Sequence, residues 1–224
     1  MKRCFIVIAI FFSSINLSGC SSTTNVIFPH WAIFEIVDLM PSIASQSYLE
    51  PVIHEKRYFE LSGLMFKPPQ GSNWFLCSQD NKGIKFIKRT DRGRMHHISA
   101  YVFISDIEVN PVDQDPLEKF VRDSIKKELR NPRFQMKSMV IRAVNFRAQE
   151  GVEIDFTIAD SGVAWAPGDV FLIKGKSVYT QNYNKRRRTI IEIGYSQSIR
   201  RGETFKDIEN EIKPFLDSIK LPIQ

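Results

Sequence analysis

The sequence predicts an α+β fold in which helices pack on a central antiparallel sheet. Two parts of the chain, residues 58–104 and 136–196, contain short runs rich in β-branched and aromatic residues, separated by Gly, Pro, Asn and Asp. Between these parts, and again near the end of the chain, apolar residues recur with the period of a helix. Two groups of strands, each followed by a helix, are typical of a sheet covered by helices.

The first group is expected to contain strands over residues 58–66, 74–78, 84–88 and 98–104, with turn residues between the first three. Both alternating sets of side chains in 98–104 are rather apolar, which indicates a central strand covered on both faces.

The mid-chain helix is expected over residues 116–130. Asp115 can cap it, Pro116 suits its first position, and Glu118 completes a capping box. Its apolar stripe contains Leu117, Phe120, Val121, Ile125 and Leu129.

The second group is expected to contain strands over residues 136–146, 152–159, 170–173, 177–182 and 189–196, the first two joined by a turn at 149–151. Along 152–159, alternation points Val152, Ile154, Phe156 and Ile158 inward. Thr204 is expected to cap a last helix whose apolar stripe runs from Phe205 to Ile219, with Pro214 inside it.

The first twenty residues have the pattern of a secretory signal peptide. Lys2 and Arg3 precede an apolar run that is shorter than the roughly 20 residues of a membrane-spanning helix. Leu17, Ser18, Gly19 and Cys20 then resemble the lipobox of bacterial lipoproteins. That resemblance implies removal of residues 1–19, lipidation of Cys20 and a periplasm-facing anchor in the cell envelope. Ser21 after the lipidated cysteine favours the outer membrane over the inner one.

Three segments follow from this pattern: the signal peptide 1–19, a lipidated tether and proline-containing connector 20–56, and a folded domain 57–224. The apolar stretch 28–40 in the connector either binds a partner or the membrane interface, or packs back on the domain. With Cys4 removed and Cys20 lipidated, Cys77 has no disulfide partner, and we expect its thiol to be buried.

The order of strands and helices, together with two short phrases, resembles the PsbP-like superfamily over about residues 57–222. The opening phrase of the family is similar to Phe66-Lys67-Pro68-Pro69 followed by Trp74. Its closing phrase is similar to Leu216 followed by Ser218-Ile219. The second proline and the longer gap to Trp74 depart from the commonest opening. The resemblance implies an antiparallel sheet between helices, an α/β/α sandwich, and no shared catalytic residues.

Motifs of serine hydrolases, zincins, dithiol oxidoreductases and phosphate loops are absent, so we predict no catalytic residues, no metal site and no cofactor. His96 and His97 point to opposite faces of a strand and cannot chelate one metal together. Either histidine has a functional role by itself, or it is simply an exposed side chain at the end of a strand. Glu153 and Asp155 share a face that Glu192 can join as acid/base candidates, or they form a solvated surface.

Lys185, Arg186, Arg187 and Arg188 form a candidate basic patch at an expected hairpin tip. Such a patch suits anionic headgroups or an acidic partner, or it blocks edge-to-edge association of sheets. Net charge falls only from +6 to +4 without Lys2 and Arg3, and no aromatic nucleic-acid motif accompanies the charges, so we expect no nucleic-acid partner.

These observations predict a lipid-anchored, non-catalytic binding or assembly module for another envelope protein, held at the membrane through Cys20. One alternative is a periplasmic hydrolase or ligand-binding enzyme with an unrecognised site. Another is a pilot or scaffold lipoprotein of a secretion or conjugation apparatus. Nothing in the pattern specifies an oligomeric state.

Overall fold

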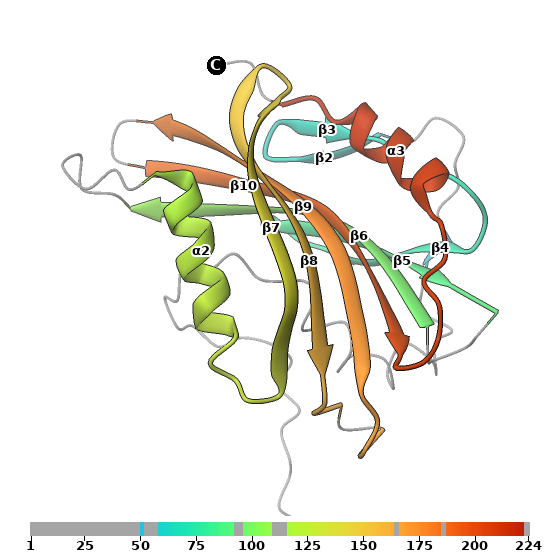
Figure 1. The fold of residues 1–224 in the computed structure, drawn as a ribbon. Helices are drawn as coiled ribbons and strands as arrows, with labels where there is room; N and C mark the ends of the chain where they lie inside the picture. The colour runs from blue at the N-terminus through green and yellow to red at the C-terminus, as the bar shows by residue number, and fades with distance from the viewer. Residues whose placement is uncertain are drawn as a thin grey trace, which may run out of the picture.

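A computed structural model describes residues 50–51, 58–91, 96–108, 116–163, 166–184 and 187–221. The predicted signal peptide 1–19, the predicted lipidation site Cys20, and the apolar stretch 28–40 lie outside these residues. Within the described part, eight strands form one antiparallel sheet in the order β1-β4-β5-β6-β10-β9-β8-β7, and β2 and β3 form a separate hairpin (Figure 1). No helix of this part is long and apolar enough to cross a membrane.

The elements occur in the expected order, except that Glu50–Pro51, within the expected connector, forms a short strand that pairs with β4. The first half contains β1 (Glu50–Pro51), β2 (Phe59–Leu61), β3 (Leu64–Phe66), β4 (Trp74–Gln79), β5 (Gly83–Arg89), β6 (His96–Glu108) and α2 (Leu117–Glu128). The second half contains β7 (Phe134–Phe146), β8 (Gln149–Asp160), β9 (Phe171–Asn184), β10 (Arg187–Arg200) and α3 (Glu209–Ser218).

The sheet has a hydrophobic core on each face, because successive side chains of a strand point to opposite sides. Helix α2 covers β7, β8 and β9 with Leu117, Val121 and Ile125. On the other face, α3 and the β2–β3 hairpin pack together (Figure 1). There the rings of Phe66, Phe86 and Phe215 meet edge to face, with centroids 6.0 to 6.5 Å apart. The predicted α+β architecture, a central antiparallel sheet with helices packed on it, is confirmed.

Strand β6 lies in the middle of the sheet, as expected, with Ala100 in one core and Tyr101 in the other. The inward set of β8, from Val152 to Ile158, is also buried as expected. Cys77 on β4 is only half-buried, although burial still raises the pKa of its thiol. The expectation of a fully buried thiol was therefore wrong.

Five predicted boundaries were wrong. Pro116 is the N-cap of α2 and not its first residue, no side chain caps this helix, and Glu118 pairs with Arg122. Residues 58–66 form a hairpin rather than one strand, and 170–182 belong largely to the single strand β9. The turn before β8 is Arg147-Ala148, whereas residues 149–151 already belong to the strand. Helix α3 begins at Glu209 after an N-cap at Ile208, so Thr204 does not cap it. For the strands and the turn before β8, backbone pairing decided the boundary, and local residue preference did not.

Candidate functional site

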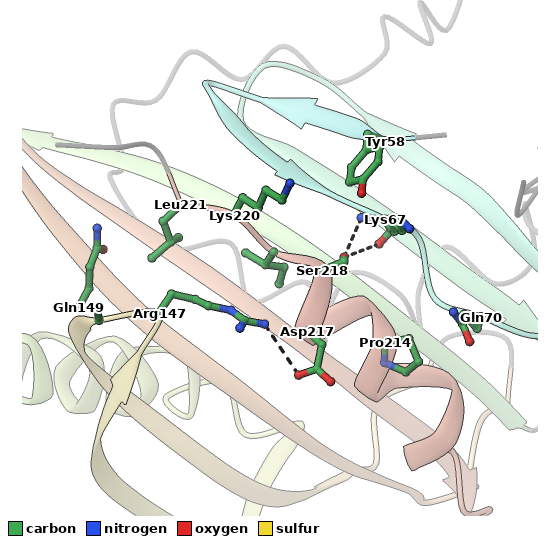
Figure 2. A pocket seen from close by; sticks show the side chains of 12 residues that line it. Tyr58, Lys67, Gln70, Arg147, Gln149, Pro214, Asp217, Ser218, Lys220 and Leu221 are labelled. Carbon is green, nitrogen blue, oxygen red and sulfur yellow. Dashed lines mark hydrogen bonds and ion pairs between the residues drawn. The ribbon is translucent and has the colours of Figure 1, made fainter. Parts of the chain in front are cut away.

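A groove of about 1000 Å³ opens between the β2–β3 hairpin, the C-terminal end of α3 and the β7–β8 turn (Figure 2). Its volume lies at the top of the range for ligand sites in proteins. The lining contains three basic side chains, one acidic side chain, an aromatic ring, and several hydroxyl and amide groups. These residues include Tyr58, Lys67, Gln70, Arg147, Gln149, Asp217, Ser218 and Lys220.

One wall of the groove is held in place by backbone pairing. Lys220 comes after α3 and forms an antiparallel bridge with Met65 of β3, with N···O distances of 3.1 and 2.8 Å. The Ser218 hydroxyl accepts a hydrogen bond from the Lys67 N–H at 2.7 Å and donates to the Phe215 carbonyl at 2.7 Å. The hairpin and the chain end are thereby joined, which places Lys67 and Lys220 on the same wall.

Tyr58 lies between the two lysines of this wall. The Lys67 and Lys220 ammonium nitrogens lie 5.2 and 5.7 Å from the centroid of its ring, within range of a cation–π interaction. Within the described part of the chain, neither ammonium group has a carboxylate within ion-pair distance. The wall therefore presents two positive charges that are not neutralised by a neighbouring acid.

Arg147 stands on the opposite wall, in the turn between β7 and β8. Its guanidinium donates to the Leu216 carbonyl at 3.0 Å and lies 3.8 Å from Asp217 Oδ1. Lys213 also donates to Asp217 and holds the pKa of that carboxyl below its ordinary value. The backbone φ angles of Arg147 and Ala148 are +54° and +64°, a left-handed conformation that disfavours residues with a Cβ. A strained turn thus positions the third cation of the groove.

A second cavity of about 270 Å³ adjoins the groove, because Gln149 lines both. Its wall includes Ile104 and Ile191 from the centre of the sheet, with Asp106, Asn182 and Thr189 among its polar residues. The Gln149 side chain is held by Thr180, whose hydroxyl donates to Gln149 Oε1 at 3.0 Å.

Of the predicted basic patch, only Arg188 has a described side chain, and that side chain does not line the groove. Lys185 and Arg186 lie outside the described residues, as does the side chain of Arg187. Arg188 is only 2% exposed, its Nε donates to Gln181 Oε1 at 2.8 Å, and its guanidinium lies 5.4 Å from the Phe120 ring centroid. The expectation that Arg188 lies at an exposed tip was wrong, because its side chain packs under α2.

Both histidines of the predicted pair are buried, so an exposed strand-end position was wrong as well. His96 is 1% exposed, and its Nε2 lies 3.3 Å from Gln197 Oε1. His97 is 2% exposed on the opposite face of β6, and neither ring nitrogen has a hydrogen-bond partner in the described structure. Burial lowers the pKa of His97 to about 3, which keeps its imidazole neutral.

Glu192 does not join the predicted carboxylate pair. Glu153 and Asp155 share one sheet face, where both accept from Arg142 Nη1 at 2.7 and 2.6 Å. Glu192 lies on the other face, 1% exposed, where Ser177 Oγ is 3.3 Å from its Oε1. Burial raises the pKa of Glu192 to about 8, although the neighbouring Tyr179 and Ser177 hydroxyls partly oppose this shift.

Tyr58, Arg147 and Lys220 carried no signal of a binding site in the sequence, and Lys67 and Ser218 appeared there only within the two PsbP-like phrases. Tyr58 and Lys67 come from the start of the domain, Arg147 from its middle and Lys220 from its end. The bridge between β3 and the chain end, together with the Lys67 N–H to Ser218 hydrogen bond, brings the first and last of these together. Among the described residues, no group of three or more His, Cys, Asp or Glu side chains is arranged to hold a metal ion.

No protein-family model and no curated protein matches the chain. Three solved structures show a distant likeness. LpqN, described as involved in cell envelope biogenesis of Mycobacterium tuberculosis, is 13% identical with a TM-score of 0.45, covering 80% of this chain and 94% of LpqN. The Saccharomyces cerevisiae Ran-binding protein Mog1p is 8% identical with a TM-score of 0.40, and the match covers 75% of this chain and 96% of Mog1p. Cyanobacterial PsbP from Synechocystis sp. PCC 6803 is 13% identical with a TM-score of 0.40, and the match covers 75% of this chain and 94% of the cyanobacterial protein. With TM-scores below 0.5, these similarities assign the chain to no family.

Proposed function

We propose that this protein is a lipid-anchored binding or assembly module of the cell envelope, with a PsbP-like domain and no catalysis of its own. The groove lined by Tyr58, Lys67, Arg147 and Lys220 is its binding site for another envelope component. The observation that carries the proposal is the pair of lysines on the Tyr58 wall, whose charges no neighbouring carboxylate among the described residues neutralises.

The chemistry of the groove suits recognition. Cations, amides and an aromatic ring supply charge pairing, hydrogen bonding and contact area, which are the interactions that orient a bound partner. The hydroxyl of Ser218, which accepts from the Lys67 N–H, itself donates to a backbone carbonyl. Its proton is engaged in holding the chain end, so this serine supports the architecture of the groove.

The predicted lipid anchor on Cys20 determines where in the cell envelope the domain is held. Cleavage after Gly19 and lipidation of Cys20 keep the domain at a membrane surface facing the periplasm, and the residue after Cys20 favours the outer membrane. Several acyl chains make such attachment effectively permanent, since each buried methylene adds about 0.8 kcal/mol. The partner is therefore a component of the same compartment.

Affinity purification of the full chain from detergent-solubilised membranes tests this function. Gln70→Trp places a bulky ring at an exposed position of the groove, and Gln135→Trp makes the same change at an exposed position of β7 outside it. We expect a reproducible partner with the wild type and with Gln135→Trp, and its loss with Gln70→Trp. Recovery of the same partner with all three chains would rule out the groove as the binding site.

A further inference from the structure

We propose that the groove takes an extended acidic segment of a protein partner, with its carboxylates placed at the groove and an uncharged polar stretch beyond Gln149. This inference rests on the proposed function and names the chemistry of the partner.

Charge complementarity identifies the acidic part of the segment. Among the described residues that line the groove, Lys67, Arg147 and Lys220 stand against the single acid Asp217, which is already paired with Lys213 and Arg147. Lys67 and Lys220 contact the Tyr58 ring and have no carboxylate partner among the described residues. An incoming carboxylate therefore meets positive charge without displacing an existing ion pair.

The placement of the donors favours several separated charges over one compact anion. A phosphate site needs donors that converge on a point, such as a row of free backbone N–H groups or an open guanidinium fork. Here the Lys67 N–H is bonded to Ser218, and the Arg147 guanidinium donates to the Leu216 carbonyl. Figure 2 shows Lys67 and Lys220 on the wall with Tyr58, and Arg147 on the other side with Gln149. Carboxylates spaced along a chain match this arrangement.

The adjoining cavity determines the polarity of the segment beyond its acidic part. Gln149 lines both cavities, so a segment bound in the groove that continues past this residue comes beside Asp106, Asn182 and Thr189. Asp106 accepts a hydrogen bond from Thr189 Oγ1 at 2.6 Å, and no basic residue is among the described residues that line this cavity. A carboxylate placed there would face Asp106, which is unfavourable, whereas hydroxyl and amide side chains would find hydrogen-bond partners. The segment is therefore acidic at the groove and uncharged beyond it.

Binding of a fluorescein-labelled peptide to the full chain in detergent, measured by anisotropy, tests the inference. The peptide has glutamates in one half and serines in the other, and the comparison peptide has glutamines in place of the glutamates. Lys67→Gln and Lys220→Gln are each expected to weaken binding about fivefold, and the double variant about 25-fold. Lys82→Gln, at an exposed turn outside the groove, is expected to bind like the wild type. Added salt should weaken binding of the wild type more than binding of the double variant.

Four outcomes would overturn the inference. The first is equal binding of the two peptides, and the second is unchanged binding by the double variant. The third is competition by inorganic phosphate as effective as that of the peptide, which would mean a single compact anion site. The fourth is retention of the chain on phosphatidylglycerol vesicles that depends on Lys67 and Lys220, without peptide binding, which would assign these lysines to a lipid surface. If Gln70→Trp still abolishes partner recovery in any of these cases, the proposed function stands and only the acidic segment is wrong.

Discussion

Replacement of Glu192 by Gln should remove most of the loss of stability that the wild type shows as pH rises from 4.5 to about 8. Glu192 is 1% exposed on the α2 side of the sheet, and its Oε2 has no hydrogen-bond partner in the described structure. Burial raises its pKa from 4.5 to about 8, so the folded protein keeps this carboxyl protonated at neutral pH while the unfolded chain ionises it.

The magnitude is set by the linkage between protonation and folding. A group whose pKa is raised in the folded state contributes stability below its unfolded pKa and loses it as pH rises toward the folded value. Between pH 4.5 and about pH 8 the wild type should therefore lose about 1.4 kcal/mol per pH unit through Glu192. By pH 7 the loss reaches about 3 kcal/mol, a large part of the 5 to 15 kcal/mol typical of a domain.

His97 acts in the opposite direction. Its pKa is lowered from 6.5 to about 3, so its contribution is complete above 6.5 and is lost as pH falls through that interval. Where the two intervals overlap, between 4.5 and 6.5, the two slopes oppose each other. We expect a broad maximum of stability in this overlap, with a fall on either side of it.

Urea unfolding at steps from about pH 4 to about pH 9 measures this profile. The difference in unfolding free energy between Glu192→Gln and the wild type should be small near pH 4.5 and grow to about 3 kcal/mol by pH 7, since His97 is common to both. Glu60→Gln, which replaces an exposed carboxylate on β2, serves as the matched control and should run parallel to the wild type. A Glu192→Gln curve that is also parallel to the wild type would refute a protonated carboxyl in the folded state.

Three further changes have defined outcomes. Ala148→Gly should raise the free energy of unfolding by about 1 kcal/mol, because glycine relieves the left-handed φ of +64° without touching Arg147; a loss of stability in urea unfolding would contradict this. Glu211→Ala should lower it by about 2 kcal/mol, because Glu211 accepts from the buried Trp74 Nε1–H at 2.8 Å and pairs with Lys88; Glu209→Ala, an exposed change in the first turn of α3, is the control. Cys20→Ala should move the chain from the membrane to the soluble fraction on cell fractionation, and a variant that stays wholly with membranes would disprove the lipid anchor.

Elements with strong periodicity were predictable from the sequence. The stripe from Leu117 to Leu129 marked α2, and the alternation from Val152 to Ile158 marked the inward face of β8, because each buried face needs apolar residues at the period of its backbone. The turn before β8 was misplaced by two residues because Arg147-Ala148 lacks the Asn-Gly chemistry that such turns favour.

Polar side chains were less predictable. Local pattern favours surface or site positions for His96, His97, Glu192 and Arg188, yet all four are 1% or 2% exposed. Burial of a polar side chain depends on which strand lies beside it and on which element covers that face, and neither is encoded within its own segment. Strand pairing placed Glu192 opposite Phe103 and Tyr179, on the face away from Glu153 and Asp155.

The sequence by itself determined the order of most elements and the two-sided burial of β6, because these depend on neighbours along the chain. Tertiary structure alone decided the groove. Its Tyr58 wall exists because Met65 pairs with Lys220 across the whole length of the domain, and its opposite wall depends on a strained turn that carries Arg147. A binding surface assembled from residues so far apart in the chain leaves no periodic or local pattern, so only the folded arrangement reveals it.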